Sequence, residues 1–265
     1  MGTASVAEAA ATLAAGNGGV LRCPKTIYHA NDFEIGANTI AVAESINPFA
    51  PHKGELHVVG SGPGNLAFLT HDARSALSRA AVWIGYSRYL DLLEPIRGHD
   101  QVRIDGQLTR ELDRCKQALE LATQGVRVAL ISSGDGGVYG MAGLALELLL
   151  AKPENERPAF QVHPGISAIQ MAASRVGAPI VNDFCCLSLS DRLTPWSTIE
   201  QRLKGAAVGD FVIAIYNPKS QYRDWQLKAA VDFLLEFRSG FTPVILAREL
   251  GRCEEEIQIH TLQNL

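Results

Sequence analysis

Hydrophobic and polar residues follow a regular order from residue 55 to the end of the chain. Short apolar runs predict strands, and runs with apolar residues at helical spacing predict helices between them. The expected strands are residues 56–60, 82–85, 126–131, 160–163, 184–189, 211–216, 242–247 and 256–262. The expected helices are residues 70–80, 109–124, 139–150, 166–176, 198–204 and 223–237. This alternation predicts an α/β fold with parallel strands, whose ligands bind beyond the carboxyl ends of the strands.

The first of the loops at those strand ends is Gly60-Ser61-Gly62-Pro63-Gly64-Asn65. A dinucleotide-binding loop would have a third glycine where Asn65 stands, and a carboxylate at the end of the next strand. That strand ends at Ile84-Gly85-Tyr86, without a carboxylate. Pro63 also lacks the amide hydrogen that a pyrophosphate would accept. The sequence therefore argues against a nicotinamide or flavin enzyme.

Three further loops carry candidate chemistry. Residues 132–137 hold three glycines around Asp135, so the backbone can approach a ligand closely. Asp135 either caps the following helix or accepts hydrogen bonds from a ligand, and both roles are compatible. The other two loops are residues 164–168, where Ser167 is a candidate helix cap, and residues 216–220.

The first 54 residues differ from the remainder. They predict a helix at 6–15, strands at 20–25 and 39–43, and a proline-containing linker at 47–54. A second break, at 152–158, predicts an N-terminal α/β domain over 55–155 and a C-terminal one over 156–265.

Composition narrows the function classes. A length of 265 residues favours about two domains, and 47% hydrophobic residues exclude wholesale disorder. The net charge of −4 argues against a general nucleic-acid-binding protein. Five cysteines without CxxC spacing favour reduced thiols in the cytoplasm and no metal site. No apolar run is long enough for a membrane span, and no basic segment precedes the N-terminal alanines, so no signal peptide is expected.

The four loops, taken in order, resemble those of the tetrapyrrole methylases, the class III S-adenosylmethionine-dependent methyltransferases. The motifs are Gly-x-Gly-Pro-Gly, Ser-Gly-Asp-x-Gly-x-Tyr-Gly-Met, Pro-Gly-Ile-Ser-Ala and Tyr-Asn-Pro. Two pairs of segments and one further motif are similar to those of the precorrin-3B C(17)-methyltransferases of cobalamin biosynthesis. The pairs are Gly85-Tyr86 with Tyr89-Leu90-Asp91 and Ser188-Leu189-Ser190-Asp191 with Leu193-Thr194-Pro195-Trp196, and the motif is Tyr216-Asn217-Pro218. The resemblance extends from about residue 55 to residue 265.

This resemblance implies a homodimer of two-domain chains, with S-adenosylmethionine held in a cleft between the domains. It implies methylation of C-17 of precorrin-3B, or of its cobalt-containing equivalent, with contraction of the macrocycle. Alternatives are methylation of another tetrapyrrole, a protein or ribosomal RNA on the same fold, or an inactive scaffold. By position, the cofactor contacts would be Pro63, Ser133, Gly134, Asp135, Val138, Ser167, Ala168, Tyr216 and a backbone group near Leu250 or Gly251.

The implied substrate carries many carboxylates, which arginine and lysine side chains bind well. Six such residues lie in or beside the expected loops, although each could instead be a solvated surface charge: Arg88, Arg110, Arg114, Arg192, Lys219 and Arg223. Tyr86, Asp183 and Asp191 are candidates for proton transfer during ring contraction. Asn65 stands where many family members have a carboxylate or small polar residue, and it cannot act as a base.

Both ends of the chain depart from the family pattern. The family usually continues past Leu265 with a strand that closes the second domain, so an exposed sheet edge is expected. The leader, over residues 6–11, 20–25 and 39–43, resembles the tail of a domain related to cobalt-precorrin-5A hydrolase. We hypothesise that the leader is the remnant of a fused cobalamin-biosynthesis domain. The alternative is an alanine-rich extension without function.

Overall fold

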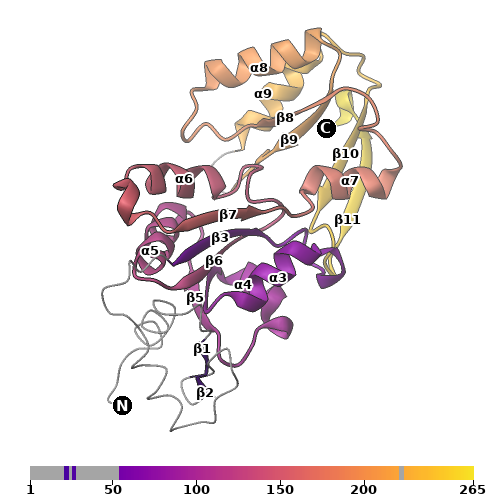
Figure 1. Ribbon diagram of the computed structural model, residues 1–265. Coiled ribbons are helices and arrows are strands. Elements are labelled where there is room, and N and C mark those ends of the chain that lie inside the picture. Colours follow the sequence, from indigo (N-terminus) through magenta and orange to yellow (C-terminus); the bar gives the residue numbers. More distant parts are fainter. Residues whose placement is uncertain (1–20, 24–25, 28–53, 221–223) are drawn as a thin grey trace. The chain divides into compact units, whose positions relative to one another are not determined.

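The computed structural model describes residues 21–23, 26–27, 54–220 and 224–265 (Figure 1). The chain divides into two compact units, unit 1 (Met1–Ser167) and unit 2 (Ala168–Leu265). Mixed helices and strands confirm the expected α/β class.

Unit 1 is built on a five-stranded parallel sheet in the order β5-β4-β6-β3-β7. Its strands are β3 (Glu55–Gly60), β4 (Val82–Tyr86), β5 (Val102–Gly106), β6 (Arg127–Ser132) and β7 (Ala159–His163). Its helices are η1 (Leu66–Phe68), α3 (His71–Arg79), α4 (Ser87–Leu93), η2 (Glu94–Ile96), α5 (Glu111–Thr123), α6 (Ala142–Leu150) and η3 (Glu154–Glu156). Because the strands are parallel, the loops that follow them start from one edge of the sheet.

Side-chain alternation along each strand supplies two hydrophobic clusters, one on each face of this sheet. Leu56 and Val58 of β3 belong to the cluster that includes buried residues of α5 and α6. Val59 belongs to the other cluster, which includes residues of α3 and α4. In that cluster Trp83 is fully buried, and its indole N–H donates to the carbonyl of Leu77 at 3.0 Å. The sheet is therefore covered by helices on both faces, which fits its nearly continuous apolar strands.

The boundary between the units lies further along the chain than the sequence predicts. The expected second domain begins at residue 156, but β7 pairs in parallel with β3 and so belongs to the sheet of unit 1. The expected hinge at 152–158 instead contains η3 and connects α6 to β7. Hydrogen bonds between strands distant in sequence decide this assignment, and the local composition does not reveal them.

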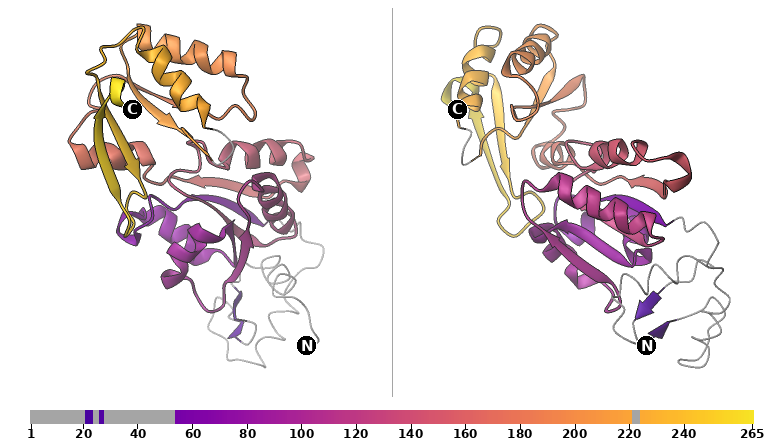
Figure 2. Two further views of the ribbon diagram at one scale, coloured as in Figure 1. Left: turned by 180° about the vertical axis from the view of Figure 1, so that it is seen from behind. Right: turned by 90° about the vertical axis from the view of Figure 1, so that its left-hand side faces the viewer.

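Unit 2 contains two separate pairs of strands, β8 (Phe184–Ser188) parallel to β9 (Val212–Tyr216) and β10 (Pro243–Arg248) antiparallel to β11 (Glu256–Thr261). The second pair is the long ribbon drawn in yellow in Figure 2. The helices are α7 (Ala168–Val176), α8 (Trp196–Val208), α9 (Trp225–Leu234) and η4 (Leu262–Asn264). Leu187 and Leu189 pack with Ile199 and Leu203 of α8 and Ala230 of α9 in one buried cluster.

Three local features differ from the expected elements. The hydrophobic pattern predicts no helix or strand where α4 and β5 lie. Helix α6 begins at Ala142 instead of residue 139, because Tyr139 adopts a positive φ of 53° that a helix cannot contain. In the leader, β1 (Leu21–Cys23) pairs with β2 (Thr26–Ile27), whereas the expected helix at 6–15, the strand at 39–43 and the linker up to residue 53 lie outside the described residues.

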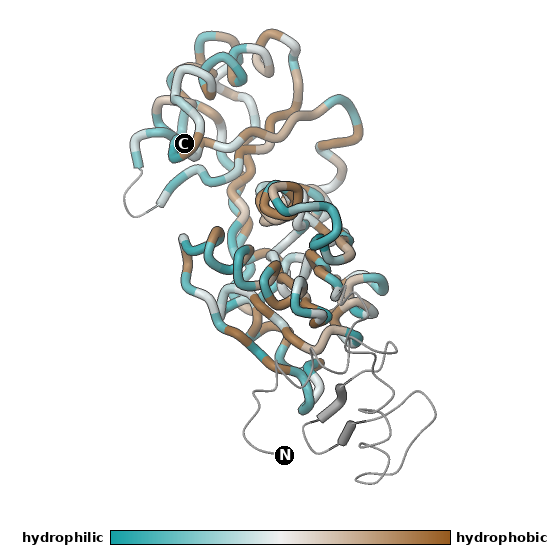
Figure 3. The backbone as a smooth tube through the Cα atoms, turned by 60° about the vertical axis from the view of Figure 1, so that its left-hand side comes forward, coloured by the Kyte–Doolittle hydropathy of each residue, from teal (hydrophilic) through white to brown (hydrophobic). Residues whose placement is uncertain are grey.

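Hydrophobic and hydrophilic stretches alternate along the traced backbone (Figure 3). Among the described helices, none combines the length and the apolarity needed to cross a bilayer.

A cluster of ion pairs joins α4, η2 and β5. Arg103 contacts Asp91, Glu94 and Asp105 at 2.5, 3.0 and 2.6 Å, and Arg97 contacts Glu94 at 2.6 Å. Hydrogen bonds from Arg97 and Arg103 lower the pKa of Glu94 to about 2. The cluster connects segments that the hydrophobic pattern alone did not reveal.

We expect Glu94→Gln to lower the free energy of unfolding at pH 7 by at most about 1 kcal/mol, since solvent screens this half-exposed carboxylate. A lowered folded-state pKa stabilises the protein above the unfolded value near 4.5 and loses that effect as the pH falls toward 2. Urea denaturation at pH 7 and pH 3 measures the difference. Glu120→Gln, on the exposed face of α5, is the control. If Glu94→Gln lowers the free energy of unfolding by as much at pH 3 as at pH 7, the prediction is contradicted.

Candidate functional site

Three loops meet at the carboxyl edge of the unit 1 sheet, after the adjacent strands β6, β3 and β7. Gly62 follows β3 and Gly134 follows β6, and their backbones exchange two hydrogen bonds of 3.0 and 2.8 Å. The first two predicted loops are therefore joined directly. The third, after β7, contacts both of them through Gly165.

Close backbone approach explains two of the glycines. A Cβ on Gly165 would lie 2.1 Å from the carbonyl oxygen of Gly134 and 2.8 Å from that of Gly60. A Cβ on Gly60 would lie 2.6 Å from the amide nitrogen of Gly165. Since real Cβ atoms do not approach backbone atoms so closely, this packing requires glycine at both positions.

Asp135 fastens the loop after β6 to the loop after β7. Its Oδ1 accepts from the amide of Gly137 at 2.7 Å, and its Oδ2 accepts from the amide of Gly165 at 3.0 Å. It does not cap α6, because the residue before that helix is Met141, which makes no side-chain capping bond. Of the two roles that the sequence left open for Asp135, helix capping is thus wrong, and its carboxylate holds loop backbone.

The remaining cofactor candidates of unit 1 also lie in these loops. Pro63 and Ser167 are buried, whereas Ser133 and Val138 are half-buried. Within the described part of the chain, the Ser133 hydroxyl makes no hydrogen bond. Sequence reasoning missed Ser132, which is buried and accepts a 3.3 Å hydrogen bond from the amide of Met141.

Thr70, also missed, connects helix α3 to the loop after β7. Its hydroxyl accepts from the amide of Ala73 at 3.1 Å and donates to the carbonyl of Pro164 at 3.0 Å. The signal available in the sequence was a threonine at the first position of the expected helix 70–80, since threonine is a common N-cap. Its second bond could not be read from the sequence.

We expect Thr70→Ala to lower the free energy of unfolding by about 1–2 kcal/mol, because the variant loses an N-cap and leaves the carbonyl of Pro164 without this donor. Thr70→Ser keeps the hydroxyl and should retain most of the stability. Chemical denaturation of the two variants beside the parent protein measures this. Equal destabilisation by alanine and serine would show that the threonine methyl group, and not the hydroxyl, is responsible.

Asn65 does not contribute a base. Its side-chain oxygen accepts from the amide of Ala67 at 2.8 Å and caps η1. This agrees with the expectation that an asparagine here cannot act as a proton acceptor.

Tyr86 ends β4 at the same edge of the sheet and is half-buried. Its ring packs edge-on against Tyr89, with centroids 5.2 Å apart. Arg88 is exposed, and Arg110 is exposed with a 3.3 Å contact to Asp113. These residues stay candidates for proton transfer and substrate binding.

Arg114 requires a correction. Its side chain is only 6% exposed, and its guanidinium donates to the carbonyl of Gln107 and contacts Glu111 at 3.3 Å. Gly106 allows this burial, because a Cβ there would lie 2.4 Å from the Arg114 side chain. The structure assigns Arg114 to the packing of α5 against the end of β5 instead of to a substrate carboxylate.

In unit 2, the two motifs with the most specific resemblance lie together. Ser188 ends β8, and its hydroxyl oxygen accepts from the amide of Ser190 at 3.2 Å and from the side chain of Asn217 at 3.0 Å. Asn217 follows β9 and has a positive φ of 52°. The hydroxyl of Tyr216 accepts a 3.1 Å hydrogen bond from the amide of Ile169. Parallel pairing of β8 with β9 brings these segments to one edge.

Of the two aspartates proposed for proton transfer, only Asp191 lies at this edge. It accepts a 3.0 Å hydrogen bond from the amide side chain of Gln226, which is 1% exposed and which sequence reasoning missed. Asp183 precedes the first residue of β8, so a five-residue strand separates it from Ser188. At about 3.3 Å per residue, the two ends of β8 are too far apart for both aspartates to serve one reacting group.

The other predicted residues of unit 2 vary in their surroundings. Leu250 is buried, and the amide of Gly251 already donates to Glu255 at 2.6 Å. Ala168, Arg192 and Lys219 are exposed, and neither cation forms an ion pair with another described residue. Arg223 lies outside the described residues.

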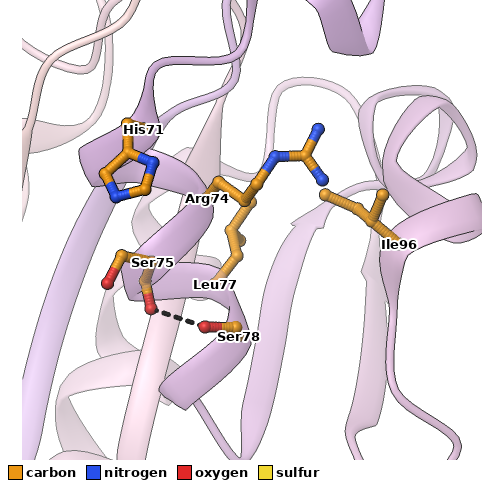
Figure 4. A pocket seen from close by; sticks show the side chains of 6 residues that line it. All are labelled: His71, Arg74, Ser75, Leu77, Ser78 and Ile96. Carbon is orange, nitrogen blue, oxygen red and sulfur yellow. Dashed lines mark hydrogen bonds between the residues drawn. The ribbon is translucent and has the colours of Figure 1, made fainter.

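A hollow of about 400 Å³ lies on helix α3, away from these loops (Figure 4). It is lined by His71, Arg74, Ser75, Leu77, Ser78 and Ile96. Ser78 donates to the carbonyl of Ser75 at 2.9 Å, within the helix. The hollow contains none of the predicted site residues.

The chain is similar to a known protein family and to several of its members. The family model of the tetrapyrrole (corrin/porphyrin) methylases matches residues 55–265. A cobalt-factor III methyltransferase from Priestia megaterium is 44% identical over 215 residues, which are 80% of this chain and 40% of that protein. A precorrin-3B C(17)-methyltransferase from a Sinorhizobium species is 41% identical over 210 residues, covering 79% of this chain and 82% of that protein. The crystal structure of the methyltransferase CobJ superposes with a TM-score of 0.76 at 36% identity, covering 80% of this chain and 88% of that one.

Proposed function

The chain belongs to the tetrapyrrole (corrin/porphyrin) methylases, and we propose that it methylates C-17 of precorrin-3B or its cobalt-containing equivalent in cobalamin biosynthesis. The methyl donor is S-adenosylmethionine, and the macrocycle contracts in the same process. The observation that carries the proposal is the 41–44% identity with C-17 and cobalt-factor III methyltransferases over 210–215 residues. The CobJ superposition, over 80% of the chain, supports it.

The residues at the carboxyl edge of the unit 1 sheet fit S-adenosylmethionine. At this edge the backbones of Gly60, Gly134 and Gly165 approach one another closely, and Ser133 offers a hydroxyl with no hydrogen bond among the described residues. The carboxylate of Asp135 puts a negative charge at the edge, complementary to a sulfonium or an ammonium group. When bound, the cofactor supplies an electrophilic methyl group on a sulfonium.

The chain's own contribution to methyl transfer is mainly positioning. Transfer to carbon requires an in-line approach, and the protein gains rate by holding both partners in that geometry. Asp135 and the paired Gly62 and Gly134 fix the backbone against which the donor would lie. In unit 2, Tyr216 and the backbone near Leu250 complete our proposed set of cofactor contacts.

Substrate carboxylates would be bound by exposed cations. Arg88, Arg192 and Lys219 are exposed and make no ion pair within the described residues, so no internal partner must be displaced. Arg110 would have to exchange its contact with Asp113. For the proton that moves during ring contraction, Tyr86 and Asp191 are our candidates, since each lies at the carboxyl end of a strand.

The test is incubation with methyl-labelled S-adenosylmethionine and the trimethylated precorrin, with and without cobalt. A labelled, ring-contracted product supports the proposal, and the cobalt arm decides which form is the substrate. Binding of S-adenosylhomocysteine without transfer to either macrocycle would overturn it. Labelling of ribosomal RNA or of protein would instead identify another acceptor, and no binding of S-adenosylhomocysteine by titration calorimetry would indicate an inactive scaffold.

We also propose a cytoplasmic homodimer, as the family resemblance implies, with residues 1–54 as the remnant of a fused cobalamin-biosynthesis domain. Light scattering on the purified chain measures the oligomeric state. A chain of residues 55–265 with the stability and activity of the full length would show that the leader serves neither.

A further inference from the structure

A row of polar side chains crosses the interior of unit 1 beneath helix α3. Arg127 contacts Glu55 at 2.8 Å, and Glu55 contacts Nε2 of His57 at 2.8 Å. Nδ1 of His57 lies 2.9 Å from Nε2 of His163, and Nδ1 of His163 lies 2.6 Å from Asp72. His57 is 5% exposed and His163 is fully buried, so the two rings lie within the core, whereas the side chain of Asp72 at the end of the row is 52% exposed.

The sheet places the two rings together. Val59 of β3 pairs with His163 of β7, and His57 lies two residues before Val59 on the same face. That face packs against α3, which contributes Asp72 from its first turn. The ring centroids are 5.1 Å apart.

The contacts fix the number of protons on the two rings. An ionised carboxylate only accepts hydrogen bonds, so Nε2 of His57 and Nδ1 of His163 must each carry a hydrogen. A neutral imidazole has one N–H, so two neutral rings would bring two bare lone pairs together at 2.9 Å. A third proton between the rings turns this contact into a hydrogen bond.

The charges along the row also favour three protons on the two rings. Arg127 and one shared imidazolium are then balanced by Glu55 and Asp72, whereas two neutral rings would leave one of the two carboxylates without a positive partner in the row. A bridging metal ion does not fit the distance. Two nitrogens bound to one zinc at about 2.0–2.1 Å would lie roughly 3.3 Å apart. No group of three metal-binding side chains was found among the described residues.

The row ends beside the proposed cofactor site. His163 is followed directly by Pro164 and Gly165, and this short segment is held at three points. These points are the contact of His163 with Asp72, the bond from Thr70 to the carbonyl of Pro164, and the bond from the amide of Gly165 to Asp135. Only the first of these involves the histidine pair, because the ring of His163 is itself held by its contact with His57.

We propose that His57 and His163 share one proton and act as a positioning pair, holding the Pro164–Gly165 segment in the geometry that S-adenosylmethionine requires. The positioning role rests on the proposed function, whereas the shared proton does not. Neither histidine touches the reacting atoms.

The proton should be lost as the pH rises. Burial lowers the pKa of His57, and the hydrogen bond to Glu55 opposes this shift. The charged groups that face the pair are Glu55 from β3, Arg127 from β6 and Asp72 from α3. Loss of the shared proton removes the central hydrogen bond between the two rings.

Nuclear magnetic resonance of the full chain labelled with [15N]histidine counts the protons directly. At pH 6 we expect both outer nitrogens to be protonated and one proton to be coupled to both inner nitrogens, with loss of one proton at higher pH. Two neutral rings with bare inner nitrogens throughout pH 5.5–8.5 would overturn the proposal. This measurement needs neither cofactor nor substrate.

The positioning role is tested by the dissociation constant of S-adenosylhomocysteine across the same pH range. Loss of the hydrogen bond that holds the ring of His163 against His57 should weaken binding about fivefold as the shared proton is lost, a typical effect of one hydrogen bond. In His57→Gln this pH dependence should disappear, because the amide can donate a hydrogen bond to Nε2 of a neutral His163 and no shared proton is needed. His99→Gln, an exposed site, is the control and should keep it.

The outcomes separate the two proposals. An unchanged pH dependence in His57→Gln overturns the positioning role even if three protons are counted. If the parent protein fails to bind S-adenosylhomocysteine at every pH, the proposed function fails, and the proton count still decides whether the shared proton exists. If His57→Gln does not fold, the parent protein alone still decides. Its dissociation constant for S-adenosylhomocysteine is compared with its proton count across the pH range. If the dissociation constant does not rise as the shared proton is lost, the positioning role is overturned.

Discussion

Replacing Gly165 by alanine should reduce the affinity for S-adenosylhomocysteine more than tenfold and lower the free energy of unfolding by about 3 kcal/mol. The new methyl group would lie 2.1 Å from the carbonyl oxygen of Gly134. That oxygen cannot retreat cheaply, because it accepts the 3.0 Å hydrogen bond from Gly62. Relief of the clash therefore separates two loops of the candidate site.

The matched control is Gly143→Ala in helix α6. No heavy atom lies within 4 Å of the position that its Cβ would occupy. Gly143 is the second residue of α6, where alanine is favoured over glycine by at most roughly 0.5–1 kcal/mol, so this variant should be at least as stable as the parent and bind normally. Calorimetric titration and urea denaturation compare the two. Binding by Gly165→Ala at the level of Gly143→Ala would show that the loop contacts do not form the cofactor site.

Substitution of Asp135 should reduce the affinity for S-adenosylhomocysteine more strongly with alanine than with asparagine. Asp135→Ala leaves the amides of Gly137 and Gly165 without their acceptor, and we expect S-adenosylhomocysteine binding to fall more than tenfold with a destabilisation of about 1–3 kcal/mol. Asp135→Asn keeps one acceptor oxygen, but its amide nitrogen would face the other N–H donor. Its affinity should lie between those of the parent protein and the alanine variant.

The control for this pair is Asp232→Asn on helix α9, where the carboxylate is exposed and contacts only Lys228 at 3.1 Å. It should change neither binding nor stability measurably. If Asp135→Asn and Asp135→Ala bind S-adenosylhomocysteine as the parent does, Asp135 is a structural clamp without a role in the cofactor site.

The regions that sequence predicted well are those governed by local pattern. The apolar runs in β3, β4 and β6 have few polar interruptions and are bounded by loops, so their positions agree with the structure to within about a residue. The loops at 60–65 and 132–137 were also identified, because a glycine-rich segment directly after an apolar strand is typical of a loop at the ligand-binding edge of an α/β sheet. Their resemblance to the tetrapyrrole methylases supplied the family, which the comparisons confirm.

The features that the sequence did not predict depend on contacts between residues that are far apart in the chain. The pairing of β7 with β3 moved the division between the units, and no local feature of residues 159–163 indicates it. Arg114 was a candidate for substrate binding because of its charge and its place beside an expected loop, with a solvated surface charge as the alternative, yet Gly106 leaves space in which it is buried. Thr70, Ser132 and Gln226 are common residue types whose roles arise only from the loops beside which the fold places them.

The histidine pair also bears on how the chain selects one pairing of its strands. β7 is an edge strand and bonds only to β3 within its sheet, so a shift by one residue would break few additional contacts. Such a shift would turn His163 to the opposite face, among the apolar side chains around Val58 and Leu56, and leave His57 and Asp72 without it. Because a buried polar group without partners is costly, the misaligned sheet is disfavoured. The two histidines thus specify the register of the strand that ends at the candidate site.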